Sequence, residues 1–207
     1  MNDNWHQQVK NKNRGDLLSA AKELFVKQSF LQVSITDVCS RAGVSRVTFY
    51  KHFQSMDDLI VDVQMEVLES MTAYVQEAAA CGQNGKAKLR SMLDAWMDYA
   101  RQQPGIIKFI LLFDLHYQSY EGNQAGKERF DRFIQEKKDQ HFLIEALETG
   151  KQDGSLKPDL EGKETGLFLF TSMMALLQKF CLAPADPWND RLQERFVDML
   201  MQNVSRK

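Results

Sequence analysis

The order of hydrophobic and polar positions along the chain predicts helices from one end to the other. Between residues 14 and 30, apolar side chains recur every three or four positions, which is typical of one face of an amphipathic helix. These positions are Leu17, Leu18, Ala20, Ala21, Leu24 and Phe25. Only four prolines and eleven glycines interrupt the 207 residues, and these are the residue types that break helices. We therefore expect an all-α protein.

Two short helices are expected after the break at SFLQVS. Thr36 is a suitable N-cap for a second helix over residues 36–42, and Gly43 can end that helix in the left-handed conformation. Ser45 is a suitable N-cap for a third helix, which continues through Phe53. Two short helices joined through a tight AGVS turn are typical of a helix-turn-helix.

The remainder of the chain is predicted to form longer helices. Ser55 and Asp58 have the spacing of a capping box, and the apolar pattern that follows them continues to about residue 80. Such a helix is about 40 Å long, so we expect the N-terminal module and the body to share it. Further helices are predicted over about 87–103, from Pro104 onward, from the GNQAG segment at 122–126 to about Thr149 before Gly150, over 159–182, and over 187–205 with Asp186 as cap and Pro187 as first residue. The total is about nine helices.

The third helix has two chemically different sides. Phe49 and Phe53 are four positions apart and face one way, together with Val44. The opposite side carries Arg46, Tyr50 and Lys51, with Thr48 and His52 beside them. A fully buried helix does not need the basic residues, and a fully solvated one does not need the phenylalanines. We infer that the aromatic side packs in a small core while the cationic side is left for a partner; the simpler alternative is a small helical hairpin with incidental charges.

The outward side chains have the chemistry that binds DNA. Arg46 can donate two parallel hydrogen bonds to guanine O6 and N7, the alternative being a phosphate contact. Lys51 can also read a base or bind a phosphate. The hydroxyl groups, the imidazole and the unpaired amides at the helix starts can bind phosphate oxygens. The predicted DNA-binding residues of this helix-turn-helix, over about 34–53, are Thr36, Ser45, Arg46, Val47, Thr48, Tyr50, Lys51 and His52.

Charge is distributed unevenly along the chain. Residues 1–56 carry eight basic and four acidic side chains, a net charge of +4, whereas the rest carries 18 basic and 24 acidic ones, a net charge of −6. A basic module on an acidic body favours a polyanionic partner for the N-terminal part.

The N-terminal quarter of the chain resembles a known family. The pattern comprises A-A-x-x-L-F at residues 20–25, T-x-x-x-x-x-x-A-G-V-S-x-x-T-x-Y-x-H-F at 36–53, and a Ser-rich turn into D-L at 55–59. This pattern resembles the tetracycline-repressor (TetR) family of bacterial transcription regulators, and the resemblance covers residues 14 to about 63. It implies three N-terminal helices that bind DNA, a long connecting helix, and a larger helical bundle that binds a ligand and dimerises.

The resemblance implies a DNA-binding domain over residues 1–57 and a ligand-binding and dimerisation domain over residues 58–207. Ser29 and Val47 stand where relatives often have glycine, and Met56 stands where a lysine is common. The missing lysine removes one phosphate contact, which flattens the salt dependence of binding by about one unit of slope. Val47 can contact a thymine methyl group and so change the sequence preference.

Aromatic and methionine side chains are plentiful in the body. They supply either the core that every bundle needs or the walls of a ligand pocket. The candidate pocket residues are Trp96, Tyr99, Phe109, Phe113, His116, Tyr117, Phe142, Phe168 and Met173. His116 is the expected polar group among these apolar walls.

The apolar pattern of the last two predicted helices indicates an oligomer. The stretch TGLFLFTSMMALLQKFCL at 165–182 is apolar nearly all round, so it must be covered on more than one side. Pairing with a two-fold mate would form a four-helix interface and present two recognition helices to successive major grooves. The family resemblance also implies a homodimer. The expected interface residues are Phe168, Ser172, Leu176, Phe180, Leu192, Phe196, Met199 and Leu200.

Several classes of protein are disfavoured. The polar N-terminus lacks the apolar region of a secretory signal, and the run IIKFILLFDLHY is too short and too charged to span a membrane. The three cysteines, Cys39, Cys81 and Cys181, are widely spaced and favour neither disulfides nor a zinc site. Hence we expect a cytoplasmic protein with no cofactor or metal. No spacing of a nucleophile and a base suggests an enzyme.

The sequence therefore predicts a homodimeric transcriptional regulator, expected to be a repressor, that a small and largely apolar effector releases from a pseudo-palindromic operator. Two alternatives stay open. One is an all-α small-molecule carrier or enzyme that retains a vestigial DNA module. The other is a helical adaptor whose basic N-terminus binds an acidic protein.

Overall fold

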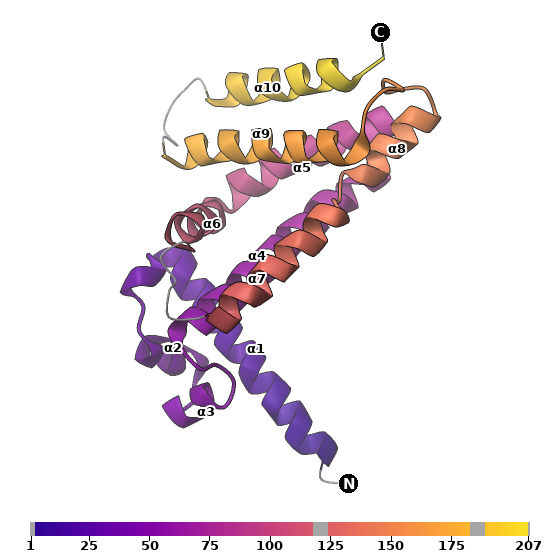
Figure 1. The fold of residues 1–207 in the computed structure, drawn as a ribbon. Helices are drawn as coiled ribbons and strands as arrows, with labels where there is room; N and C mark the ends of the chain where they lie inside the picture. Colours follow the sequence, from indigo (N-terminus) through magenta and orange to yellow (C-terminus); the bar gives the residue numbers. More distant parts are fainter. Residues whose placement is uncertain (1–2, 118–123, 183–188, 207) are drawn as a thin grey trace. The chain divides into compact units, whose positions relative to one another are not determined.

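The described part of the chain is built from helices. The computed structural model describes residues 3–117, 124–182 and 189–206, and side chains at 11–117, 124–181 and 191–206. These residues form ten α-helices and two short 3-10 helices, with a single isolated β-bridge between Leu156 and Ser205 (Figure 1). The all-α prediction is confirmed.

The helices follow one another with short connections. They are α1 (Asp3–Lys27), η1 (Phe30–Gln32), α2 (Ile35–Ala42), α3 (Arg46–Tyr50), α4 (Met56–Glu77), η2 (Ala78–Cys81), α5 (Gly85–Gln102), α6 (Pro104–Tyr117), α7 (Gln124–Asp139), α8 (Ile144–Gln152), α9 (Gly162–Leu182) and α10 (Asn189–Val204). Pro104 begins α6 as predicted. The predicted caps Asp186 and Pro187 lie outside the described residues.

The N-cap of the second helix is Ser34, and the prediction of Thr36 was wrong. The Ser34 hydroxyl accepts the Asp37 N–H at 3.2 Å, and the Asp37 carboxylate accepts the Ser34 N–H at 2.9 Å. This reciprocal capping box satisfies two amide groups at once, so the helix begins one residue before Thr36. The first helix likewise ends at Lys27 rather than Phe30, because residues 30–32 tighten into η1.

The helix predicted from about residue 122 to Thr149 is two helices. The first ends at Asp139, and a turn that buries His141 precedes the second, which starts at Ile144 and continues through Gly150 to Gln152. Gly150 does not end the helix. It allows close packing instead, because a Cβ atom on Gly150 would lie only 2.4 Å from the Leu156 side chain. A Cβ atom on Gly85 would likewise lie only 2.0 Å from the Gly150 backbone nitrogen.

Helix α4 is shorter than predicted, and its cap differs in detail. It ends at Glu77 and is followed by η2. The Ser55 hydroxyl accepts the Asp58 N–H at 3.1 Å, as the capping-box spacing predicts. The Asp58 carboxylate, however, accepts the N–H of Gln54 at 3.1 Å rather than that of Ser55.

Two compact units divide the chain. The first comprises Met1–Val67 and Lys108–Asp131, so the division passes within α4, α6 and α7. Its core contains the inner faces of α1, α2 and α3 and a group of phenylalanine rings. Phe25 stacks on Phe109 at 5.6 Å between ring centroids, and Phe113 meets Phe130 edge-on at 4.9 Å. The boundary expected after residue 57 stays a prediction.

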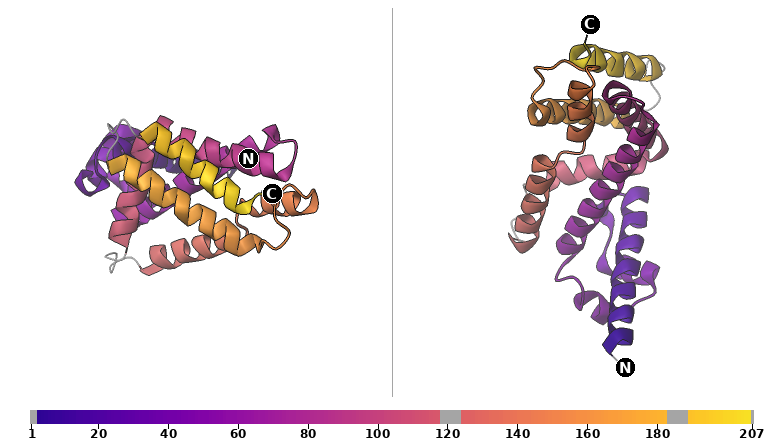
Figure 2. Two further views of the ribbon diagram at one scale, coloured as in Figure 1. Left: turned by 90° about the horizontal axis from the view of Figure 1, so that it is seen from above. Right: turned by 90° about the vertical axis from the view of Figure 1, so that its right-hand side faces the viewer.

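The second unit comprises Leu68–Ile107 and Arg132–Lys207. In it α5 packs against α8, α9 and α10, and α9 and α10 lie side by side in each view (Figures 1 and 2). The end of α10 is held beside the turn after α8, since the Lys157 N–H donates to the Val204 carbonyl at 3.0 Å. Trp96, Leu89 and Leu147 are fully buried in the core of this unit.

Candidate functional site

The candidate recognition helix α3 is fixed by local signals at both ends. Gly43 adopts φ +67°, the left-handed conformation that ends α2. Ser45 then caps α3, with its hydroxyl accepting the Thr48 N–H at 3.1 Å. The same hydroxyl lies 3.0 Å from the Thr48 hydroxyl. Hydrogen bonds within the protein therefore already engage both hydroxyl groups.

The two sides of α3 differ as the spacing predicts. Helix α3 ends at Tyr50, so the prediction that it continues through Phe53 was wrong. Phe49 in the helix and Phe53 three residues after its end are 0% and 1% exposed, so they anchor this segment in the core of the first unit. Val47 and Tyr50 are 67% and 51% exposed on the other side. Contact with DNA remains a prediction for the whole set of residues. Of the others, Arg46, Lys51 and Thr36 are exposed, and His52 is half-buried.

Some basic side chains of the first unit form ion pairs with carboxylates of the described residues, and others do not. Arg41 and Lys27 both bind Glu23, at 2.5 and 2.7 Å. The Arg41 hydrogen bonds, followed by that of Lys27, lower the pKa of Glu23 to about 2. By contrast, Arg46 and Lys51 form no ion pair with any described residue. Arg46 and Lys51 are therefore available to a polyanion, as are the exposed Lys12 and Lys108, which also form no ion pair with a described residue.

A cavity of about 390 Å³ lies within the second unit. Its walls come from α4, α7, α9 and the turn before α8. The lining residues are Leu68, Met71, Thr72, Gln76, Phe133, Ile134, Glu136, Lys137, Lys138, Gln140, His141, Phe142, Leu167, Phe170 and Thr171. Aliphatic and aromatic side chains supply much of the wall and two lysines supply positive charge, so the lining suits a molecule with a large apolar part.

His141 is the buried polar group of this cavity. It is 6% exposed, and its Nδ1 atom accepts the Leu143 N–H at 3.3 Å. Nε2 therefore carries the proton of the neutral ring, yet it has no hydrogen-bond partner among the described residues. Burial lowers the pKa of His141 to about 4, so the ring is neutral at pH 7. A ligand acceptor could satisfy this donor.

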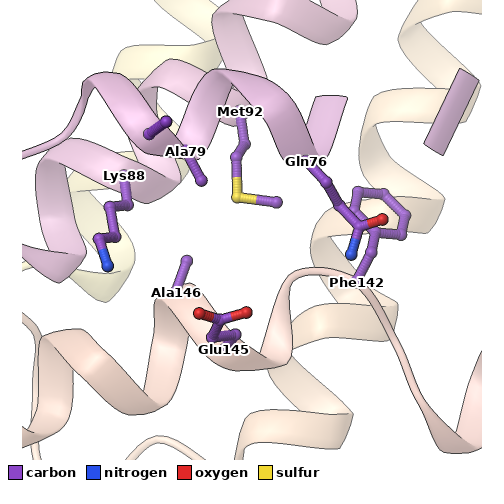
Figure 3. A pocket seen from close by; sticks show the side chains of 8 residues that line it. Gln76, Ala79, Lys88, Met92, Phe142, Glu145 and Ala146 are labelled. Atoms are coloured by element: carbon purple, nitrogen blue, oxygen red, sulfur yellow. The ribbon is translucent and has the colours of Figure 1, made fainter. Parts of the chain in front are cut away.

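A second hollow of about 350 Å³ adjoins the cavity (Figure 3). Gln76 and Phe142 line both spaces. The other residues of the hollow are Ala79, Ala80, Lys88, Met92, Glu145 and Ala146. Figure 3 shows the Met92 side chain pointing into the hollow, with Lys88 and Glu145 supplying charges of opposite sign.

The structure separates the candidate pocket residues chosen from the sequence. Trp96 contacts Phe142 and Phe170, at 5.3 and 5.4 Å between ring centroids, and its Nε1 atom has no hydrogen-bond partner in the described part of the chain. Met173 and Tyr99 are buried in the same unit, but Phe168 is 56% exposed and so faces away from the core. The remaining four, Phe109, Phe113, His116 and Tyr117, belong to the first unit.

The histidine that lines the cavity is His141, and sequence reasoning singled out His116 instead. His116 is half-buried and packs edge-on against Phe30 in the first unit. The sequence gives no signal for His141, because its pattern predicts a single helix from about residue 122 to Thr149. The wall contributed by Leu68 and Met71 was missed for another reason, since their apolar pattern continues that of the core.

The predicted dimer residues lie on both sides of the last two helices. Phe168, Leu192 and Met199 are 56%, 41% and 55% exposed, which is unusual for large apolar side chains. Leu176 and Leu200 are buried within the chain itself. The others, Ser172, Phe180 and Phe196, are half-buried.

Two broad searches of the described residues bear on function. None of the helices described here is both long and apolar enough to cross a membrane. Within the same residues, no group of three or more acidic, histidine or cysteine side chains could hold a metal ion.

Comparisons with known proteins match the helix-turn-helix most specifically. The sequence pattern described as "Bacterial regulatory proteins, tetR family" matches residues 17–63. The chain is 29% identical to the HTH-type transcriptional activator FasR of Mycolicibacterium smegmatis over 90 residues, which are 44% of this chain and 41% of that protein. The match therefore spans less than half of that relative.

Solved structures match the whole fold. A TetR family transcription regulator from Marinobacter aquaeolei VT8 has a TM-score of 0.65 at 18% identity, over 97% of this chain and 100% of that one. The transcriptional regulator FadR from Bacillus subtilis, solved in complex with stearoyl-CoA, has a TM-score of 0.69 at 14% identity, over 91% and 98%. The shared fold extends through the second unit, and the family pattern lies on the helices that carry the unpaired cations. Residues 17–63 therefore match the tetR family of bacterial regulatory proteins, and the solved structures show that the chain shares their fold.

Proposed function

We propose that the protein is a ligand-responsive transcriptional regulator whose α3 helices bind a pseudo-palindromic operator. The observation that carries the proposal is the two-sided helix: Phe49 anchors it in the core, while Arg46 and Lys51 are exposed and form no ion pair with a described residue. The match of residues 17–63 to the tetR family supports the same assignment. An adaptor that binds acidic proteins would also need exposed cations, but it would not discriminate between DNA sequences.

The test is a binding measurement on DNA. Duplexes selected by the protein from a random pool, and DNA from beside its own gene, would be titrated by fluorescence anisotropy at several salt concentrations. We expect one selected sequence to bind at least a thousandfold more tightly than an unrelated duplex at the same salt. Equal and weak affinity for every duplex would favour the adaptor or the carrier instead.

The effector of this regulator is proposed to bind in the cavity of the second unit. A volume of about 390 Å³ suits a small molecule. The apolar walls accept an apolar chain, and the Nε2–H group of His141 and the two cavity lysines accept a polar or anionic group. FadR, which shares the fold, was solved with stearoyl-CoA, so that compound is a suitable first probe.

Release of DNA requires that the effector bind one state of the protein more tightly than the other. We propose that the occupied cavity favours a spacing of the two recognition helices that does not fit the operator. Stearoyl-CoA would then lower operator affinity and raise the melting temperature, whereas free coenzyme A would do neither. A melting temperature raised without any change in operator affinity would contradict regulation by this cavity.

The regulator is proposed to act as a cytoplasmic repressor and as a homodimer. The exposed apolar side chains Phe168, Leu192 and Met199 on α9 and α10 support pairing with a second copy. Met199→Asp should shift the molecular mass in sedimentation toward the monomer, whereas Glu69→Gln, on α4, should not. A reporter gene behind the selected operator would distinguish a repressor from an activator such as FasR.

A further inference from the structure

Two nearly buried carboxylates on α4 share a single arginine from α7. Arg129 donates from its Nη2 atom to Asp58 Oδ1 at 2.8 Å and to Asp62 Oδ1 at 2.7 Å. The side chains of Asp58 and Asp62 are only 12% and 11% exposed. Contacts this little exposed to water are weakly screened, so this cluster differs from the ion pairs on the surface.

The first carboxylate also closes the turn behind the recognition helix. Asp58 Oδ2 accepts the Gln54 N–H at 3.1 Å, and the Asp58 N–H donates to the Ser55 hydroxyl at 3.1 Å. Gln54 directly follows Phe53, the buried ring that anchors the end of the helix-turn-helix. The carboxylate that Arg129 holds therefore fixes the place where the chain leaves the recognition helix.

The second carboxylate, that of Asp62, is linked to Phe53 through Arg14. Asp62 Oδ2 accepts a hydrogen bond from Arg14 of α1. The Arg14 guanidinium in turn lies 5.4 Å from the centre of the Phe53 ring, which is the geometry of a cation–π contact. Arg129 is thus linked to Gln54 through Asp58, and to Phe53 through Asp62 and Arg14.

The helices that carry this cluster also carry walls of the cavity. On α7, Phe133 and Lys137 follow Arg129 at intervals of four residues, and both line the cavity. On α4, Leu68 and Met71 line it farther along the helix from Asp62. A ligand that changes the spacing between α4 and α7 would therefore act on the same two helices that Arg129 joins.

We propose that Arg129 is a positioning residue for DNA binding: it holds the end of the recognition helix through Asp58 and Asp62, and occupancy of the cavity acts on the operator by loosening this contact. The proposal rests on the proposed function, because it names how the cavity would regulate DNA binding. Arg129 itself contacts neither DNA nor the ligand.

The positioning role is tested with Arg129→Gln and a matched control. Glu69→Gln breaks another contact between the same two helices, the 3.5 Å pair of Glu69 with Lys137, which does not touch the turn at Gln54. We expect Arg129→Gln to weaken binding to the selected operator about tenfold and Glu69→Gln to change it less than twofold. Arg129→Lys should restore part of the affinity, because a lysine is a point charge that lacks the planar guanidinium fork.

Amide exchange followed by NMR separates positioning from a general loss of stability. In Arg129→Gln the Gln54 N–H should exchange faster, while the Thr48 N–H, which the Ser45 hydroxyl caps, should keep its protection relative to global unfolding. Equal acceleration at both amides, or unchanged exchange at Gln54, would overturn the positioning role.

The coupling role is tested without knowledge of the natural effector. Thr72→Trp places an indole ring at the wall of the cavity and serves as a permanent occupant. It should weaken operator binding about tenfold in the wild-type background and less than twofold in the Arg129→Gln background. Additive effects, or no effect of Thr72→Trp alone, would contradict the coupling. A wild-type protein that selects no operator would instead overturn the proposed function, and this inference with it.

Discussion

The exposed side of α3 and the wall of the cavity both contain polar groups without partners, but the two places differ in hydration. Arg46 and Lys51 are exposed, so water can satisfy them until a polyanion replaces it. His141 Nε2 is buried and has no partner among the described residues, so it costs free energy until another group accepts its hydrogen bond. The first arrangement suits a large partner that arrives from solution, and the second suits a small molecule that is enclosed.

The largest expected effect concerns the buried side of α3 and tests whether this side anchors the helix. Phe49→Ala should destabilise the first unit by about 3–5 kcal/mol, because a fully buried ring leaves a cavity when it is removed. Val47→Ala, at an exposed position two residues away, should change stability by less than about 0.5 kcal/mol. Urea denaturation of both variants measures this difference. Similar small losses would mean that the aromatic side does not anchor the helix.

The pH dependence of stability tests whether His141 is buried without a partner in the cavity wall. The pKa of His141 is lowered from 6.5 to about 4 by burial, so the unfolded chain binds a proton between these values when the folded chain does not. Stability should therefore fall as the pH drops from about 6.5 to about 4, by up to about 3 kcal/mol from this residue. Below pH 4 both states are protonated, and the loss stops growing.

The control for this prediction is His141→Phe, measured by urea denaturation across the same pH range. The variant removes the titrating group, so its stability should decline less steeply than that of the wild type, while acidic residues contribute equally to both. Parallel curves would show that His141 is hydrated or partnered in solution.

A smaller effect is expected at the cap of α2. Ser34→Ala removes the reciprocal bonds with Asp37 and should cost about 1 kcal/mol. Thr36→Ala should cost less than about 0.5 kcal/mol, because Thr36 caps nothing. Thermal denaturation compares the two. An equal or larger loss at Thr36 would contradict the observed cap.

The comparison also explains which parts of the molecule could be predicted from sequence. The helix-turn-helix is specified by neighbours in the chain: Gly43 ends one helix, Ser45 starts the next, and the spacing of Phe49 and Phe53 sets the buried side. Local chemistry of this kind is visible in the sequence. Even here Ser34 was missed, because several polar residues near the start of α2 are acceptable caps.

The cavity could not be predicted in the same way because distant segments assemble it. Met71, Phe133, His141 and Phe170 lie on four separate elements, and their apolar residues have the same spacing as those of the core. His141 becomes a cavity residue only because α7 ends at Asp139. The hydrophobic pattern does not indicate this end of the helix, because Phe142 and Leu143 continue the apolar spacing.

The smallest expected effect concerns the salt dependence of DNA binding. Lys51→Ala should reduce the slope of log affinity against log salt by about one unit, because one phosphate contact is lost. Lys179→Ala, an exposed cation on α9, should leave the slope unchanged. Anisotropy titrations at four or more salt concentrations would detect the change. An unchanged slope for Lys51→Ala would mean that this lysine does not touch the backbone.

The most direct test of the central claim, that the exposed side of α3 reads DNA, is a binding measurement for wild type and Arg46→Ala on every single-base variant of the selected operator. The account predicts that Arg46→Ala loses about 1–3 kcal/mol and that the loss is concentrated at one guanine in each half-site. A uniform loss across all variants would make Arg46 a phosphate contact. Unchanged affinity and discrimination would contradict the assignment of α3 as the recognition helix.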